Sequence, residues 1–220
     1  IAGGGVFCSA GTINASGTVI RENDAPNGGG VYCASGSTVN INDGTTINSN
    51  TASEDGGGAV NYGTMTVNGG IFTGNTAVDE GGGIWNDGTL TIDAATVTGN
   101  TTDNYGAGIY TKSNISMQGT VNVSSNHRSN GWDNNVFLTN GHLIVVTGSL
   151  GNSSIGVNHE SQSGMVTSGY RAHNRENYHF TNDYASITSL EYVNDEVRLS
   201  FNGGVEYVER RWDNANKRVV

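Results

Sequence analysis

A run of glycines followed by an apolar residue recurs at a nearly constant spacing through the first two-thirds of the chain. The runs start 25, 28, 25 and 25 residues apart, at Gly3, Gly28, Gly56, Gly81 and Gly106. A degenerate copy at Gly131 keeps the 25-residue step. A fixed period of this length is typical of solenoid proteins, in which each repeat forms one coil and packs against its neighbours.

A second motif keeps the same phase. In each period an apolar residue is followed three positions later by asparagine, five or six residues before the next glycine run. The five copies end at Asn23, Asn50, Asn75, Asn100 and Asn126. Because two different motifs keep one register over five copies, the repeat is a structural unit. The chain is rich in Gly, Asn, Thr and Ser, but its fixed apolar positions indicate a packed core and not a linker.

The pattern inside one period predicts strands. Between Gly81 and Tyr105, three short runs alternate apolar and polar residues, separated by turn signals such as Asp87-Gly88. Alternation with a period of two predicts a strand with one apolar face, and no helical period is found. Each coil should therefore contain three short strands. The inward-facing positions of this coil are Ile84, Asn86, Leu90, Ile92, Ala95 and Val97.

Stacking such coils predicts an all-β fold, a right-handed single-stranded parallel β-helix with three sides and about 25 residues per coil. Equivalent strands pair in parallel ~4.8 Å apart, so roughly six coils form a rod near 30 Å long. The right hand follows from the crossover rule for parallel strands. Glycines at the corner permit positive φ and a close approach of coils, and the asparagines suit a ladder of side-chain amides. The glycine runs do not read as phosphate-binding loops, because no Lys-Ser/Thr and no helix follows them.

The chain changes character after the repeats, which divides it into a β-helix repeat domain at residues 1–157 and a β-rich capping segment at residues 158–220. Only 4 of the 34 glycines lie in the second part. Residues 136–157 read as a last, more apolar coil, and residues 189–193 and 197–201 as a β-hairpin near the open end of the core. The aromatic residues expected to lie across that end are Tyr170, Tyr178, Phe180 and Tyr184. From Gly204 onward we expect the start of a linker or a following module.

The charge of the repeat domain restricts its partners. The formal net charge of the chain is −10, and residues 1–157 carry 11 acidic and 3 basic residues. A long acidic surface repels phosphate backbones, which argues against nucleic acid as a partner. No apolar stretch approaches the ~20 residues that span a bilayer, so no membrane-spanning segment is expected. Because Ile1 lies inside a repeat, we expect further β-helix coils of the same parent chain.

The two motifs together resemble the GGA[ILV] and FxxN repeats of polymorphic outer-membrane proteins and related adhesin-like surface proteins. The runs Gly57-Gly58-Ala59-Val60 and Phe72-Thr73-Gly74-Asn75 match these patterns letter for letter, and the other copies are looser. The resemblance covers about residues 1–157. It implies a secreted or surface-displayed right-handed parallel β-helix.

Carbohydrate cleavage is the main rival function, because pectin lyases and polygalacturonases use β-helices. Such sites gather carboxylates and a catalytic Arg, Lys or His on one face. Here the basic residues of the coils, Arg21, Lys112 and Arg128, share no column. Asp87 and Asp93 have no carboxylate beside them in the neighbouring coil, so no acid pair forms. The five histidines fall in turns or in the terminal segment and are expected to be solvated. We therefore predict no catalytic residue and no cofactor.

The two cysteines, Cys8 and Cys33, occupy the same position of consecutive coils. Stacked strands place their Cα atoms ~4.8 Å apart, within the range of a disulfide. Parallel strands in register hold Cβ atoms farther apart than the ~3.8 Å of a relaxed bond, which favours two stacked thiols over a disulfide. The same buried column continues through Asn61, Asn86 and Thr111.

Two surface features are candidates for binding. Outward-facing aromatic residues form a column interrupted at Val60, at Phe7, Tyr32, Trp85 and Tyr110. Exposed rings stack on sugars or form protein hot spots, although cross-strand packing alone also accounts for such a column. Four carboxylates crowd ~5 Å apart over two coils, where they either hold Ca²⁺ or splay into solvent. They are Glu54, Asp55, Asp79 and Glu80.

These features favour a non-catalytic module of a large secreted or cell-surface adhesin-like protein. The module would act as an elongated scaffold for adhesion to glycans or proteins of host or neighbouring cells, and its expected location is extracellular or at the cell surface. The alternative is a carbohydrate-binding or carbohydrate-active β-helix of the pectin-lyase or tailspike type.

Overall fold

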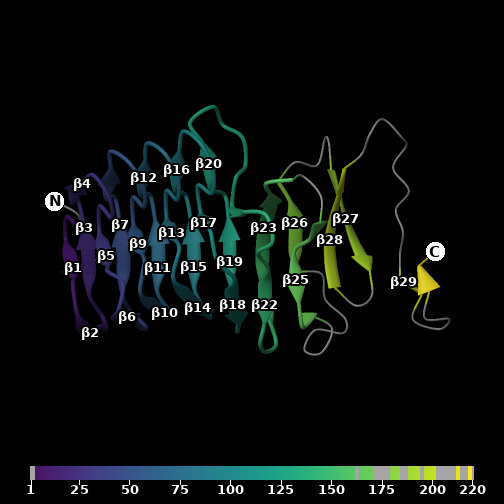
Figure 1. Ribbon diagram of the computed structural model, residues 1–220, viewed down its shortest axis with the longest axis horizontal. Helices are drawn as coiled ribbons and strands as arrows, with labels where there is room; N and C mark the ends of the chain where they lie inside the picture. Colours follow the sequence, from purple (N-terminus) through teal and green to yellow (C-terminus); the bar gives the residue numbers. More distant parts are fainter. Residues whose placement is uncertain are drawn as a thin grey trace.

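The computed structural model describes residues 3–161, 164–170, 179–183, 188–193, 196–201, 212–213 and 218–219. Within these residues the chain is a β-solenoid, as the repeat predicts. Its coils follow one another along the longest axis of the molecule, from β1 beside the N-terminus to β23 (Figure 1). Equivalent strands of successive coils pair in parallel, and their registers match the period of the sequence.

Each regular coil contributes four short strands, one more than the pattern predicts. The first strand row consists of β1 (Val6–Cys8), β5 (Val31–Cys33), β9 (Ala59–Asn61), β13 (Ile84–Asn86), β17 (Ile109–Thr111) and β21 (Val136–Leu138). The second row consists of β2 (Gly11–Ala15), β6 (Ser37–Ile41), β10 (Thr64–Asn68), β14 (Thr89–Asp93), β18 (Ile115–Gln118), β22 (Ile144–Val146) and β25 (Thr167–Ser168). The third row consists of β3 (Val19–Arg21), β7 (Thr46–Asn48), β11 (Ile71–Thr73), β15 (Thr96–Thr98), β19 (Asn122–Ser124), β23 (Ser154–His159) and β26 (Phe180–Asn182).

The additional strand has only two residues and follows the asparagine that ends the second motif of each coil, which we call the ladder asparagine. This fourth row consists of β4 (Asp24–Ala25), β8 (Thr51–Ala52), β12 (Thr76–Ala77), β16 (Thr101–Thr102) and β20 (His127–Arg128). It pairs in parallel like the longer rows, with Ala77 opposite Ala52 and Thr102. The prediction of three strands per coil is therefore wrong, because a two-residue strand is too short to show an alternation.

The four rows form three parallel sheets. The second row is a seven-stranded sheet and the fourth row a five-stranded one. The first and third rows join into one sheet through β23, whose two ends pair with β19 and β21. The second row has one strand from each turn, so the solenoid has about seven turns and not the six expected. Parallel pairing continues beyond residue 157, because β25 pairs with β22 and β26 with β23.

The core is a column of apolar side chains enclosed by the sheets, with inward and outward positions as predicted. Val97 is fully buried between Phe72 and Val123, the residues that pair with it on the neighbouring strands. The columns through Leu90 and Ile92 on the second row are buried in the same way. Alternation along each strand explains this, since every second side chain points into the core.

Glycine clusters form the tight corner between the fourth and first rows. Gly81 has a φ of 69°, a conformation that only glycine adopts readily. A Cβ atom added to Gly82 would lie 2.7 Å from the carbonyl oxygen of Ala107 in the next coil, so the coils meet too closely there for a side chain. Both roles predicted for the glycines are confirmed.

The C-terminal end carries the predicted hairpin, formed by β27 (Thr188–Val193) and β28 (Glu196–Phe201), with β24 (Gly164–Met165) on the far side of β28. Tyr170, Phe180 and Val197 belong to the same apolar cluster as the coils. Tyr178 and Tyr184 lie outside the described residues, as do residues 204–211, while β29 (Trp212–Asp213) pairs with β30 (Arg218–Val219). Within the part that the structure describes, no helix is long and apolar enough to cross a bilayer.

Candidate functional site: an aromatic stripe and an adjoining polar groove

Aromatic rings run along the outer face of the first strand row. Register places Phe7 beside Tyr32, Trp85 beside Tyr110, and Tyr110 beside Phe137. Val60 occupies the same position of β9, between Tyr32 and Trp85. We call the set the aromatic stripe, and it comprises Phe7, Tyr32, Tyr62, Trp85, Tyr110 and Phe137.

Tyr62 fills the place that Val60 leaves vacant. Its ring centroid lies 5.8 Å from that of Tyr32 and 5.0 Å from that of Trp85. The other neighbouring centroids are 5.3, 6.4 and 5.6 Å apart, within the ~4.5–7 Å range of favourable ring pairs. The stripe is therefore continuous over six coils.

The centre of the stripe is buried, and here the prediction of an exposed column is wrong. Trp85 is 3% exposed, Tyr110 6% and Phe137 4%, and with Val60 they form an apolar cluster of their own. Each ring is covered by its neighbours, and the Lys112 ammonium lies 5.0 Å from the Trp85 ring centroid. Exposed rings remain at the end of the stripe, where Phe7 is 51% exposed, and at its edge, where Tyr62 is 40% exposed.

One of the four crowded carboxylates, Glu80, binds this aromatic cluster, and a second, Asp55, holds Glu80. Glu80 accepts a hydrogen bond from Nε1 of Trp85 at 3.2 Å, and Asp55 accepts one from the backbone N–H of Glu80 at 3.1 Å. Burial, followed by the charge of Glu80, raises the pKa of Asp55 to about 6. Burial, followed by the charge of Glu80, also raises the pKa of the Tyr110 phenol.

The four carboxylates do not converge on a metal site. Glu54 accepts a hydrogen bond from the side-chain amide of Asn27, and Asp79 accepts one from that of Asn104. Among the described residues there is no group of three or more His, Cys, Asp or Glu side chains placed to hold a metal ion. The calcium alternative is therefore not supported, because each carboxylate has a different partner.

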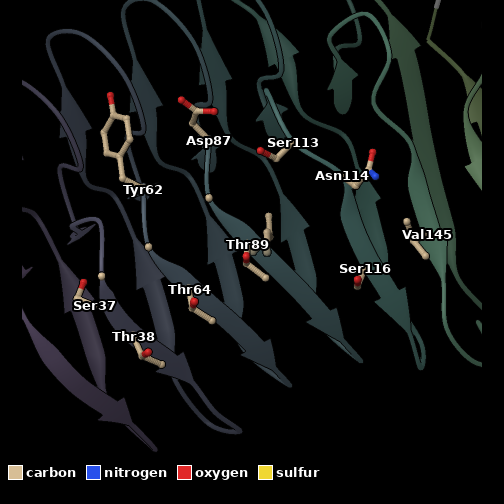
Figure 2. A pocket seen from close by; sticks show the side chains of 14 residues that line it. Ser37, Thr38, Tyr62, Thr64, Asp87, Thr89, Ser113, Asn114, Ser116 and Val145 are labelled. Atoms are coloured by element: carbon tan, nitrogen blue, oxygen red, sulfur yellow. The ribbon is translucent and has the colours of Figure 1, made fainter.

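A groove of about 760 Å³ adjoins the stripe at Tyr62 and crosses the corner between the first and second strand rows. Figure 2 shows Tyr62 and Asp87 on the turns along one side, with Thr38, Thr64 and Thr89 on successive strands opposite. Their register follows the pairing of β6, β10 and β14. The groove also reaches Ser113, Asn114, Ser116 and Val145.

Asp87 and the threonines of this groove are available to a ligand. Asp87, Thr64 and Thr89 are exposed, and no side-chain hydrogen bond of these three is found among the described residues. Tyr62 is held by the rings on both sides and by its backbone N–H, which donates to the Cys33 carbonyl at 2.8 Å. The charge of Asp87 contributes to the raised pKa of Tyr62, after burial and the influence of Tyr32 and Asp55.

The two cysteines are stacked thiols and not a disulfide, as the sequence analysis favours. Cys8 and Cys33 pair in register and are free, buried thiols. The column continues through Asn61, whose side-chain amide donates to Asn86 at 2.7 Å, and Asn86 donates to Thr111 at 3.0 Å. This column is part of the packing of the coils.

Two histidines are buried, so the prediction that all five are solvated is wrong for these two. His159 is 6% exposed and His179 3%, and burial lowers the pKa of both. They lie at the C-terminal end of the solenoid, where β23 and β26 close the core. Nδ1 of His127 lies 2.8 Å from Oδ1 of Asp133, and Nδ1 of His142 forms a hydrogen bond with the Thr139 hydroxyl. His173 lies outside the described residues.

The basic residues of the coils are dispersed, as expected. Lys112 covers the stripe, the guanidinium of Arg128 lies over the ring of Tyr105, and Arg21 is 3.7 Å from Glu22. Asp93 accepts a hydrogen bond from the Gln118 side chain at 2.7 Å and does not line the groove with Asp87.

Sequence reasoning missed Tyr62, Phe137 and the groove. Phe137 had a visible signal, since it stands in the predicted strand after Tyr110 at the same position. Tyr62 follows an inward asparagine at a turn, where alternation no longer gives the direction of a side chain. The groove is formed by a corner between two rows, and no single strand pattern describes it.

Comparisons with family models, with curated proteins and with solved structures each found no match to this chain.

Proposed function

We propose that the chain is a non-catalytic module of a large secreted or cell-surface adhesin-like protein, with the solenoid as an elongated scaffold for adhesion to other cells. The observation that carries this proposal is the groove, which runs along one side of the molecule over five strands of the second row with the exposed Tyr62 at its edge. A recognition surface repeated over several coils gives many weak contacts, and display of several such modules multiplies them by avidity. The resemblance of the repeats to those of adhesin-like surface proteins supports the same function.

Carbohydrate cleavage fits the groove less well. Glycoside hydrolysis ordinarily requires two carboxyl groups that face each other across the scissile bond. Asp87 is the single carboxylate among the residues that line the groove, and Lys, Arg and His are missing from that lining. The remaining lining is made of hydroxyl groups, the amide of Asn114, glycines and apolar residues, which bind a chain without supplying an acid and a base.

Attachment and turnover assays test the proposal together. The fluorescently labelled chain should attach saturably to a panel of epithelial and bacterial cells, and it should release no product from pectin, polygalacturonate or neutral polysaccharides. Attachment to no cell type would contradict the adhesive role. Turnover of any polysaccharide that Asp87→Asn abolishes would establish the enzyme instead.

A further inference from the structure

The groove between the first and second strand rows is long and polar. It extends from Thr38 on β6 to Val145 on β22, across five consecutive strands of the second row. Four steps between parallel strands amount to about 19 Å. Its volume of about 760 Å³ lies within the range of pockets that bind small molecules and cofactors. A ligand that fills it is an extended chain lying along the axis of the solenoid.

Tyr62 supplies an aromatic wall of fixed position. Tyr62 is 40% exposed and lines the groove, while Tyr32 and Trp85 hold its ring at centroid distances of 5.8 and 5.0 Å. A ring fixed in this way loses little conformational entropy when a ligand packs against it. Aromatic side chains combine a large apolar face with a polar edge, which suits the C–H face and the hydroxyl rim of a sugar ring.

The opposite wall offers hydrogen-bonding groups at a regular spacing. Register places the hydroxyl-bearing residues Thr38, Thr64 and Thr89 on neighbouring strands ~4.8 Å apart. Each hydroxyl donates one hydrogen bond and accepts others, so a row of them matches a ligand that carries hydroxyl groups along its length. Asp87 adds an ionised acceptor, whose bond to a hydroxyl donor is short and strong.

The charge of the groove selects against acidic ligands. Asp87 is its single ionised residue, and the chain as a whole carries a formal charge of −10. Phosphates, sulfates and uronic acids therefore meet repulsion without a compensating cation. A neutral oligosaccharide meets no such electrostatic repulsion.

We propose that the groove at Tyr62, Thr64, Asp87 and Thr89 is a binding subsite for neutral oligosaccharides that lie along the solenoid axis. This inference rests on the proposed adhesive function and names the ligand class of the same face. The exposed part of Tyr62 packs against one sugar ring, Asp87 accepts a hydrogen bond from a hydroxyl of that ring or the next, and the threonines bind the following units.

Calorimetric titration of the full chain with neutral hexasaccharides tests the proposal. The probes are cellohexaose, mannohexaose and chitohexaose, with hexagalacturonate as the acidic comparison. At least one neutral probe should bind, and hexagalacturonate should bind at least 10-fold more weakly or not at all. Tyr62→Ala should weaken binding of the neutral probe at least 10-fold, and Thr64→Val, which keeps the shape of the side chain, at least 3-fold.

Tyr105→Ala is the matched control, because Tyr105 is 39% exposed but lies outside the groove. It should leave the affinity unchanged. Thermal unfolding of each variant separates lost binding from lost folding, and Thr64→Val serves as the decisive variant if Tyr62→Ala unfolds. Failure of all three neutral probes, or equal affinity of the wild type, Tyr62→Ala and Thr64→Val, would overturn the proposal.

The cell assay distinguishes this failure from failure of the proposed function. If groove variants attach to cells as well as the wild type does, the glycan subsite is wrong and the adhesive scaffold stands. If the wild type attaches to no cells, the adhesive function is wrong, and the calorimetric titration alone decides whether the groove binds neutral oligosaccharides.

Discussion

Individual turn residues of the solenoid are under conformational strain. The residue before each ladder asparagine has a positive φ, and Gly74 and Gly99 occupy that position in two of the coils. Ser49 and Ser125 adopt the same conformation without being glycine, at φ values of 54° and 56°. Ala94 is strained in the same way at another turn, with a φ of 50°. The left-handed conformation costs non-glycine residues roughly 1–2 kcal/mol each.

Ala94→Gly should therefore stabilise the protein by about 1 kcal/mol. Ala94 is exposed, so the change removes strain and little packing. The converse change, Gly99→Ala, should destabilise by about the same amount, because the new Cβ would have no neighbour closer than 3.7 Å and only the φ of 66° opposes it. Urea denaturation of both variants measures the two changes. A loss of stability in Ala94→Gly would show that strain is not the dominant effect.

The raised pKa of Asp55 makes stability depend on pH. Its value in the folded chain is about 6, above the 3.8 of an unperturbed aspartate. A raised folded-state pKa contributes stability that is fully present below the unfolded pKa and is lost as the pH rises through the folded one. The contribution of Asp55 to stability should therefore decrease between pH 5 and pH 7.5.

Asp55→Asn isolates this contribution, because an asparagine oxygen still accepts the hydrogen bond from the Glu80 backbone. The loss of stability between pH 5 and pH 7.5 should be smaller in the variant by roughly 1 kcal/mol, since solvent screens part of the effect. Equal pH dependence of the two proteins, measured by urea denaturation at both pH values, would contradict this assignment.

At the scale of elements, a chain of side-chain amides holds the coils in register. Nδ2 of each ladder asparagine donates to Oδ1 of the next one at 2.9 Å, from Asn23 to Asn126. Asn126 then donates to Asn135 at 3.0 Å, and Asn135 donates to Asp183 at 2.8 Å. Each asparagine oxygen from Asn50 to Asn126 also accepts the backbone N–H of the asparagine before it.

Asn75→Ala should cost at least about 3 kcal/mol, because it leaves several buried polar groups without partners. Asn75 accepts from the backbone and side chain of Asn50 and donates to Asn100 and to the Ile47 carbonyl. Asn40→Ala is the control, since its bond to Asn14 is exposed and its loss should cost less than about 1 kcal/mol. Equal midpoints of urea unfolding in the two variants would refute a structural role for the ladder.

The sequence predicts strand pairing and the inward face of each strand well, because a single repeated pattern determines each of them. The period of 25 residues sets which strands pair, and alternation sets which face of each strand enters the core, as at Val97. Alternation gives the side on which Trp85 lies but not its burial, since Tyr62 and Lys112, which cover it, come from turns. Strands β25 and β26 were not expected as parts of a seventh turn, because the segments leading to them do not keep the period.

At the scale of the whole molecule, the solenoid depends on how its last turn is closed. Each coil contacts only its neighbours, so an open end exposes core and unpaired strand edges. Here Glu196 at the start of β28 accepts hydrogen bonds from the Thr167 hydroxyl and from the backbone N–H groups of Gly169 and Tyr170. The next residue, Val197, is fully buried in the core cluster. Glu196 thus connects the hairpin to the end of the coils.

Glu196→Ala should loosen the last turn without unfolding the rest. Amide hydrogen exchange at residues 167–170 should accelerate at least 10-fold, because two backbone N–H groups lose their acceptor. Exchange in β10 and β14, several coils away, should remain as in the wild type. Glu160→Ala is the control, since Glu160 is exposed and accepts only from the Asn140 backbone among the described contacts. Uniform acceleration along the solenoid would instead show that the protein unfolds as one unit.

The amide ladder also has a polarity, because every hydrogen bond between two of its asparagine side chains is donated toward the C-terminal coil. Each coil thus presents the same acceptor at one junction and the same donor at the other. Excising or duplicating one 25-residue period, such as residues 81–105, brings together two junctions that already match. The solenoid can therefore gain or lose whole repeats in evolution without requiring a new interface between coils. Two rods meeting with equal ends would have no such match, so every added coil must keep the same chain direction as the rest.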